Sequence, residues 1–419
     1  MNICHLEGVR DKQEANGANL HRKEKLCKVI FDFEGCDSGS SDYNSEEVME
    51  GLQPHSNLQS LIVRHYGGES FPSWMLRPVG DSNTDLSLLH NLVELKFFYC
   101  INCESLPPLG QLHNLHYLKM RNLKKVKRMG NEFYCNEGVD SMNKVIMVFP
   151  ALKRFTLRGM ESLEEWTAMA ETKMFMFPCL ERLNIWVCPL LKSVPLTGQC
   201  YSLEKLRIFS YEKLSKIGDG VCTSTCLKEL DLDNCPDLIR SYNKLEVLPI
   251  TGGCSSLEML CISRCKKLSK IGDGLSTSTC LKEFRLEYCL NLSSIPKFEG
   301  FSSLQNLSVD GCDKLEVLPI TGGCSSLEKL CIFFSEKLSK IGDGLSTYTC
   351  LKEFCLLDCP NLSSIPNLEG FSSLQNLSVD GCDKLEVLPI TGGCSSLEKL
   401  CISHCEKLSK IGDGLSTST

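Results

Sequence analysis

Cysteine and histidine are the residue types in this chain best suited to chemistry. The 419-residue sequence holds 27 cysteines, and a thiolate can bind a metal, form a disulfide or act as a nucleophile. Cys100-x-x-Cys103 has the spacing of half a zinc site, but no second pair completes it, and His113-x-x-His116 has no obvious third ligand. We therefore expect no metal and no cofactor in this chain.

Signatures of catalysis and of secretion are also missing from the sequence. It contains no G-x-x-x-x-G-K-[ST] phosphate loop and no G-x-S-x-G motif, so we expect no catalytic residues and no enzyme activity. The odd cysteine count and an N-terminus without a signal peptide indicate a reducing, cytoplasmic (intracellular) location. No apolar run reaches about 18 residues, so we expect no membrane span. The net charge of -7 argues against nucleic acid as a partner.

An internal repeat sets the elements that position these residues. Residues 272–341 and 342–411 are nearly the same block, and each block divides into three units. Each unit reads L-x-x-L-x-I-x-x-C-x-x-L, which is the leucine-rich-repeat consensus. The units begin at leucines that follow one another at steps of 23 or 24 residues: Leu257, Leu281, Leu304, Leu327, Leu351, Leu374 and Leu397.

This consensus predicts how each unit folds. The alternation L-x-I predicts a short strand with one buried face, and coils must stack because a single coil cannot bury its own apolar side. We expect an α/β solenoid: a leucine-rich-repeat horseshoe with a parallel strand sheet on the concave face and a mostly irregular or short helical convex side. The cysteines at the turn after each strand are expected to be buried and inert. They are Cys100, Cys188, Cys235, Cys265, Cys289, Cys312, Cys359, Cys382 and Cys405.

The repeat changes in regularity along the chain. Residues 1–56 are predicted to form partial N-terminal repeats with an acidic loop at 35–47, and residues 57–250 to form irregular repeats. Residues 251–419 hold the regular repeats of the duplicated 70-residue blocks. Neither end carries the polar cap that a repeat array needs, so we expect a fragment of a longer protein.

The outward positions of the predicted strands are the candidate protein-binding surface. The third, fifth, seventh and eighth consensus positions point away from the core, and they include Cys261, Cys331, Cys355 and Cys401. One stretch of this concave face is basic and aromatic, and the next coil turns acidic at Glu229, Asp231 and Asp233. Arginine and aromatic side chains are typical interface anchors. The candidates in the first stretch are Arg121, Arg154, Arg158, Arg182, Trp186, Arg207 and Phe209.

The duplicated blocks add a second group of candidates. The blocks differ at ten positions, and five of these fall at outward strand positions, which are a small minority of the block. A scaffold copied faithfully while its outward residues change suggests a recognition surface under pressure to vary. Relaxed constraint on exposed residues is the competing explanation. The five positions are Arg285, Glu287, Tyr288, Phe333 and Phe334.

Motifs in the first half of the chain follow the order found in one known family. They include Tyr66-Gly67-Gly68, Phe71-Pro72-Ser73-Trp74 and Leu106-Pro107-Pro108-Leu109-Gly110. With these motifs the chain resembles the leucine-rich-repeat region of plant intracellular disease-resistance receptors, of the coiled-coil, nucleotide-binding type. The nucleotide-binding switch domain of such receptors is absent from this sequence.

The resemblance implies a non-catalytic protein-recognition module in plant innate immunity. Such a module would sense a pathogen effector or a guarded host protein, or make autoinhibitory contacts with the receptor's switch domain, and this chain would be a truncated receptor. The alternative is a repeat adaptor, such as the substrate-binding subunit of a ubiquitin ligase, although no ligase-binding helix precedes the repeats.

Overall fold

The chain folds into two compact units, which are described separately. The first comprises residues 1–203 and 209–221, and the second residues 204–208 and 222–419. The computed structural model describes residues 1–34, 44–76, 88–135, 146–167, 174–196, 200–209, 213–218, 225–236, 247–248, 255–390 and 393–412.

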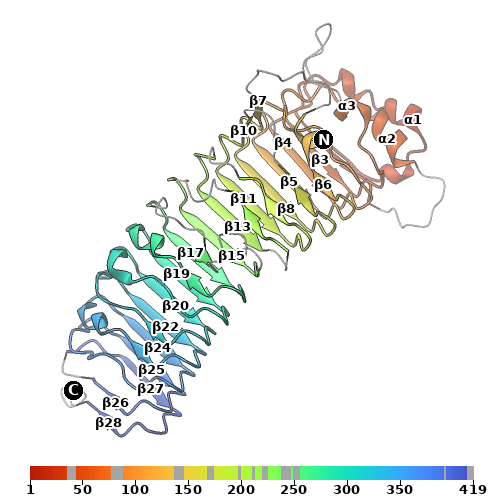
Figure 1. Ribbon diagram of the computed structural model, residues 1–419. Coiled ribbons are helices and arrows are strands. Elements are labelled where there is room, and N and C mark those ends of the chain that lie inside the picture. Colours follow the sequence, from red (N-terminus) through yellow and green to blue (C-terminus); the bar gives the residue numbers. More distant parts are fainter. Residues whose placement is uncertain are drawn as a thin grey trace. The chain divides into compact units, whose positions relative to one another are not determined.

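The first unit is built on a parallel sheet whose strands follow one another in chain order (Figure 1). Neighbouring strands pair in register without slippage; for example, Arg154 of one strand lies opposite Arg182 of the next. The strands are β1 (Asn2–Ile3), β2 (Lys28–Asp32), β3 (Ser60–Arg64), β4 (Glu94–Phe98), β5 (Tyr117–Arg121), β8 (Arg154–Arg158) and β11 (Arg182–Trp186).

The second unit repeats this arrangement with more regular spacing. It starts with β13 (Lys205–Phe209), of which only Phe209 belongs to the first unit. The strands then run as β15 (Glu229–Asp233), β17 (Met259–Ser263), β19 (Glu283–Glu287), β20 (Asn306–Asp310), β22 (Lys329–Phe333), β24 (Glu353–Leu357), β25 (Asn376–Asp380) and β27 (Lys399–Ser403). The predicted parallel-strand solenoid is confirmed in both units.

Apolar burial between coils explains why the consensus residues recur. In the coil of β19, the leucine positions Leu281, Leu286 and Leu292 are fully buried, as are Phe284 and Cys289. Alternate residues of the strand point to opposite faces, so the residues between these positions stay accessible. Burying such a side chain stabilises the fold by about 1.5–3 kcal/mol. Each coil can bury its apolar side chains only against the neighbouring coils.

The segments that connect the strands of the large sheets have more regular secondary structure than the sequence indicated. Besides short 3-10 helices, they carry pairs of two- or three-residue parallel strands. The helices in the second unit are η3 (Asp273–Thr277), η4 (Phe298–Gly300) and η5 (Asp343–Thr347). The strand pairs are β6 (Arg128–Met129) with β9 (Glu165–Trp166), β7 (Ile146–Val148) with β10 (Met174–Met176), β12 (Ser193–Val194) with β14 (Lys216–Ile217), β16 (Val247–Leu248) with β18 (Lys270–Ile271), β21 (Val317–Leu318) with β23 (Lys340–Ile341), and β26 (Val387–Leu388) with β28 (Lys410–Ile411).

The remaining helices lie in the first unit. They are η1 (Leu6–Gly8), α1 (Lys12–Asn16), η2 (Leu20–Arg22), α2 (Ser45–Gly51), α3 (Ser73–Leu76) and α4 (Asn131–Tyr134). The start of α2 shortens the loop predicted at 35–47, because the Asn44 side chain caps this helix by accepting from the amides of Glu46 and Glu47. Residues 35–43 of that loop lie outside the described residues. Among the described helices, none has the length and apolar character to cross a membrane.

The turn cysteines are buried, as predicted, except for Cys405 near the end of the second unit, which is half-buried. The Cys289 thiol donates to the carbonyl oxygens of Glu287, at 3.6 Å, and Ile262, at 3.7 Å, so it bridges its own turn to the preceding coil. Burial raises the pKa of Cys289 to about 11 and that of Cys188 to about 12, which keeps both thiols protonated. These thiols are therefore structural groups rather than nucleophiles.

One of the cysteines predicted to point outward is shielded. Cys331 is 3% exposed, whereas Cys401 is exposed and Cys261 and Cys355 are half-buried. Cys331 lies in register between Ser308 and Cys355, and their strands flank it on both sides. The expectation of an exposed thiol at Cys331 is wrong because the alternation pattern does not include the cover provided by neighbouring strands.

We expect alkylation of the native chain to separate these thiols. Iodoacetamide should modify Cys401 at least about tenfold faster than Cys331 or Cys289, because a buried thiol reacts only when the chain opens. Peptide mass spectrometry after a timed quench measures each rate, and the same reaction in urea provides the fully accessible control. Equal rates for Cys401 and Cys331 in the native chain would contradict the burial of Cys331.

Candidate protein-recognition surface

The solvent-facing side of each large sheet, here called the strand face, carries the candidate residues. In the first unit, Arg154 and Arg158 are exposed, and Arg121, Arg182 and Trp186 are half-buried. The strand register brings them together, since Arg121 lies opposite Arg158 and Arg154 lies opposite Arg182. The structure therefore gathers these predicted residues on β5, β8 and β11.

Aromatic rings hold the cationic side chains of the first unit in place. The Arg154 guanidinium lies 5.3 Å from the centre of the Tyr117 ring, and that of Arg158 lies 5.9 Å from Trp186. Trp186 in turn stacks on Phe209, with ring centres 4.3 Å apart. Sequence reasoning missed further cation–aromatic pairs, namely Arg64 and Lys119 with Phe98, and Arg121 with Tyr99. Phe98 and Tyr99 at the seventh and eighth consensus positions of their coil were the signal that could have revealed them.

The arginines of this surface have no acidic partner within the described residues. No carboxylate lies within ion-pair distance of Arg121, Arg154, Arg158 or Arg182, whereas Lys96 on the neighbouring β4 pairs with Glu94 at 2.5 Å. Like charges directly opposite on adjacent strands are destabilising. This part of the strand face therefore holds concentrated positive charge that contributes nothing to the fold through ion pairs.

Ion pairs neutralise two of the three acidic residues that the sequence predicted in the coil of β15, namely Glu229 and Asp233. In the second unit, Glu229 is 5% exposed and accepts from Arg207 and from Lys205, whose Nζ lies 2.6 Å away. Asp233, also 5% exposed, accepts from the Arg264 guanidinium, with Nε 2.7 Å from Oδ1. Arg207 is therefore occupied within the chain, and the exposed acidic patch predicted at this coil is wrong for Glu229 and Asp233.

Asp231, between these two acids on β15, has no such partner within the described residues. Burial raises the pKa of its carboxyl to about 6, and the nearby charges of Asp233, Glu229 and Glu287 add to the rise, although Arg207 opposes it. The ionised form of Asp231 is thus less favourable in the folded chain than in the unfolded chain.

We expect Asp231→Asn to stabilise the chain at pH 7. The folded pKa lies above the unfolded value of about 3.9, so the contribution of Asp231 to stability is full below that value and is lost as pH rises through about 6. Asparagine stays neutral, so the gain should be about 1–2 kcal/mol at pH 7 after allowance for solvent screening, and vanish near pH 4. Urea unfolding at both pH values measures it. A gain of equal size at pH 4 would contradict this origin.

The five outward strand positions among the ten differences between the duplicated blocks all lie on the accessible side of the second unit. Arg285, Tyr288 and Phe334 are exposed, and Glu287 and Phe333 are half-buried. Arg285 forms an ion pair with Glu283 of its own strand. Because none of the five is buried, exchanging them between the copies leaves the packed core unchanged.

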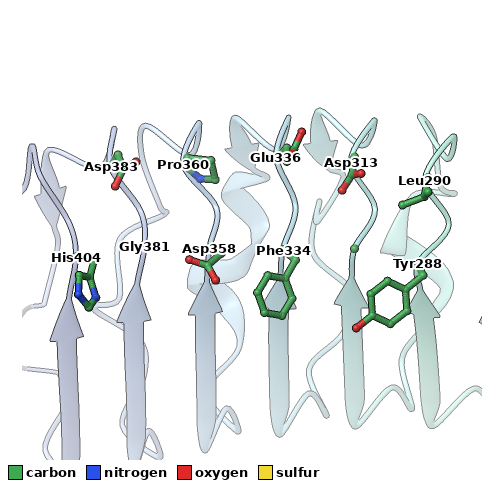
Figure 2. Close-up of a pocket in the computed structure, with 11 residues that line it drawn as sticks. Tyr288, Leu290, Asp313, Phe334, Glu336, Asp358, Pro360, Gly381, Asp383 and His404 are labelled. Atoms are coloured by element: carbon green, nitrogen blue, oxygen red, sulfur yellow. The ribbon is translucent and has the colours of Figure 1, made fainter.

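Tyr288 and Phe334 belong to a row of residues that leave the strands in the left-handed conformation. Tyr288, Gly311, Phe334, Asp358 and Gly381 have φ between 46° and 65°, and His404 continues the row at 45°. The amides of the first five donate to the carbonyl that ends the next coil's strand, as Tyr288 N–H does to Asp310 O at 2.7 Å. These residues line an open groove of about 590 Å³ at the ends of β19 to β27 (Figure 2).

Two small groups of side chains have the composition of metal ligands. Cys331, Glu353 and Cys355 place their ligand atoms within 4.8 Å of one another, as do Asp32, Glu34 and His65. Each group is already engaged, since Lys329 pairs with Glu353 at 2.9 Å and His65 with Asp32 at 3.0 Å.

The Cys100-x-x-Cys103 pair lies in the core of the first unit. The Cys103 thiol donates to the Gly68 carbonyl at 3.3 Å, and its neighbour Cys100 and burial raise its pKa well above the usual range. A buried Cys103 thiol with a raised pKa is a poor start for a zinc site, because zinc binds the thiolate. The pair therefore packs as apolar core.

Comparisons with known proteins agree with the repeat architecture. A family model described as R13L1/DRL21 LRRs matches residues 1–123. The chain is 27% identical over 327 residues to putative disease resistance RPP13-like protein 1 of Arabidopsis thaliana, covering 76% of this chain and 27% of that protein. It is 32% identical over 192 residues to putative disease resistance protein RGA4 of Solanum bulbocastanum, covering 45% of this chain and 18% of that protein. The chain thus spans less than a third of either relative.

Solved structures with similar folds are more distant in sequence. A leucine-rich-repeat protein of Leptospira interrogans is 15% identical with a TM-score of 0.38, over 87% of this chain and 92% of that one. Toll of Drosophila, in its complex with Spatzle, is 12% identical with a TM-score of 0.42, over 98% of this chain and 49% of that one.

Proposed function

Because the chain is a leucine-rich-repeat protein related to plant disease resistance proteins, we propose that it is a non-catalytic protein-recognition module in plant innate immunity. It acts in the cytoplasm, where it binds a pathogen effector, a guarded host protein or the switch domain of a resistance receptor. The relatives support the immune role. The thiols of Cys100, Cys103 and Cys289, which form no disulfide, are compatible with a reducing compartment.

One observation carries the recognition part of the proposal. The strand face of the first unit gathers Arg121, Arg154, Arg158 and Arg182 on three strands, and no carboxylate within the described residues lies within ion-pair distance of them. A purely structural surface would intersperse acids, as the second unit does at Glu229. Arginine beside aromatic rings is the composition of an interface centre.

The charge of this surface sets the chemistry of its partner. Unpaired guanidinium groups bind carboxylates strongly and often through two parallel hydrogen bonds. The complementary protein surface is therefore acidic. The overall charge of -7 does not conflict with this, because steering and contact depend on the local patch.

A double charge reversal tests the proposal. Candidate pathogen and host proteins are screened against the chain, and the affinity of each hit is measured for Arg154→Glu/Arg158→Glu. We expect binding at least about tenfold weaker, because both reversed charges then face an acidic partner. The variant should stay within about 1 kcal/mol of wild-type stability, since two cation–aromatic contacts are lost while glutamates come to lie opposite Arg121 and Arg182.

The matched control is Lys124→Glu/Lys125→Glu, which changes the net charge equally. Both lysines are exposed and lie in the turn after β5, outside the strand face. The control should bind as the wild-type chain does. Equal affinity for the wild-type chain and the Arg154→Glu/Arg158→Glu variant would overturn recognition through this surface.

A further inference from the structure

The groove of the second unit combines aromatic rings with carboxylates and contains neither lysine nor arginine among its lining residues. Tyr288 is 48% exposed and Phe334 is 45% exposed. Asp313, Glu336, Asp358 and Asp383 line the same groove. Figure 2 shows the rings of Tyr288 and Phe334 on the same edge of the sheet, two coils apart, with the acidic side chains above and beside them.

Gly311, in the coil between the two rings, lets Tyr288 lie across the groove. A Cβ on this glycine would come within 2.7 Å of Tyr288 Cδ1, so any larger residue would displace the ring. Gly311 also has a φ of 60°, which glycine adopts without strain. Tyr288 and Phe334 hold left-handed φ values of 52° and 46°, which are costly for bulky side chains.

Accessible aromatic rings of the two units differ in whether a cationic side chain of the same chain covers them. In the first unit, Phe98, Tyr99, Tyr117 and Trp186 each lie beneath a lysine or arginine of the same chain. Within the described residues, no such cation covers Tyr288 or Phe334. The π face of an aromatic ring attracts a cation, and guanidinium groups are the commonest partners. The groove thus offers ring faces whose preferred partner is not supplied by this chain.

One oxygen of the Asp310 carboxylate also lacks a hydrogen-bond partner within the described residues. Asp310 precedes Gly311 and lies in register between Glu287 and Phe333. Its Oδ1 atom is buried and has no hydrogen-bond partner within the described residues. Burial and the Glu287 charge raise the pKa of Asp310 above its usual value. A buried acceptor without a donor is unfavourable, and a cation bound nearby would favour the ionised form of Asp310.

We propose that this groove binds an arginine side chain presented by a partner protein, with the guanidinium plane against Tyr288 and Phe334 and its N–H groups directed to Asp313 and Glu336. The inference rests on the proposed recognition function and names the chemistry of a second contact. Arginine fits better than lysine because its planar fork both stacks on rings and pairs with carboxylates in two hydrogen bonds.

The other copy of the duplicated block explains why the site is single. Asp358 and His404 stand where the first copy has Tyr288 and Phe334. His404 Nδ1 lies 2.8 Å from Asp380, so this end of the groove supplies its own cationic partner. The arginine site is therefore confined to the coils of β19, β20 and β22.

Blocked tripeptides provide the test without a known partner. The probes are Ac-Gly-Arg-Gly-NH2, the same peptide with neutral citrulline in place of arginine, and Ac-Gly-Lys-Gly-NH2. Binding to the full chain is followed by saturation-transfer NMR on the peptide. We expect the arginine peptide to bind in the millimolar range, the lysine peptide at least about threefold more weakly, and the citrulline peptide not detectably. Equal signals from the arginine and citrulline peptides would overturn the proposal.

Variants locate the binding. Tyr288→Asn/Phe334→Asn removes the rings while placing a residue that tolerates the left-handed conformation, so the fold should persist. Asp313→Asn/Glu336→Gln removes two carboxylates. Each variant is expected to weaken the arginine peptide at least about fivefold, whereas Tyr201→Ala, which removes a 63% exposed ring elsewhere, should have no effect. Unchanged binding by both groove variants would refute the site. Since Arg154 and Arg158 are intact throughout, that failure would leave the proposed function standing.

Discussion

Trp166→Ala is expected to destabilise the first unit by about 3–5 kcal/mol, because it removes a large ring from a closed core. Trp166 is 1% exposed and meets Phe155 and Phe177 edge-on, with ring centres 5.4 Å and 6.1 Å apart. Its Nε1 donates to the Tyr134 hydroxyl at 2.8 Å, which donates to the Thr167 carbonyl at 2.8 Å. The substitution leaves both a cavity and a buried hydroxyl with one partner fewer.

Trp186→Ala provides the control for this prediction. Trp186 is half-buried on the strand face, and its ring contacts are with Phe209 and Arg158. Its removal should cost about 1 kcal/mol or less in stability. Urea unfolding followed by circular dichroism measures both variants. A loss for Trp186→Ala as large as that for Trp166→Ala would contradict the division between core and recognition surface.

The second prediction with a large effect concerns the duplicated blocks. A five-residue variant gives the first copy the outward residues of the second. It replaces Arg285 with Cys, Glu287 with Leu, Tyr288 with Asp, Phe333 with Ser and Phe334 with His. We expect stability within about 1 kcal/mol of wild type, because none of the five is buried and the same scaffold already carries these residues. Partners that bind through the second unit should lose detectable binding, because the aromatic anchors are gone.

The control changes a buried position at which the two copies differ. Phe298→Leu copies a fully buried position whose counterpart is Leu368, also fully buried. It should leave partner binding unchanged and cost up to about 1.5 kcal/mol through imperfect packing. If the outward exchange leaves every measured interaction of the chain unchanged, relaxed constraint explains those differences better than recognition does.

The coil was predictable from sequence because its determinants are local. The leucine and cysteine spacing fixes which side of each strand is buried, and this held from Leu281 to Cys289. The short strand pairs outside the large sheets were missed, although the dipeptides that form them end in an apolar residue and recur at the repeat spacing, as Val317-Leu318 and Lys340-Ile341 do. Two-residue strands are too short for a periodic signal.

The site was less predictable because it depends on which neighbours supply counter-charges. Arg182 and Arg207 look alike in the sequence, but only Arg207 meets a carboxylate, that of Glu229 on the next strand. The left-handed backbone conformation of Tyr288 and Phe334 was also not predictable from their residue types. Gly159, Gly311 and Gly381 at the same consensus position were the available signal, since glycine favours that conformation. The buried acceptor of Asp310 emerges only once the coils are stacked.

The salt dependence of partner binding tests the central claim most directly. For a partner found with the wild-type chain, the dissociation constant is measured from 50 to 500 mM salt, for the wild-type chain and for Arg154→Glu/Arg158→Glu. If unpaired arginines on the strand face of the first unit bind an acidic protein, the wild-type affinity falls steeply with salt and the variant's much less. Parallel salt dependences for the two chains would contradict the claim.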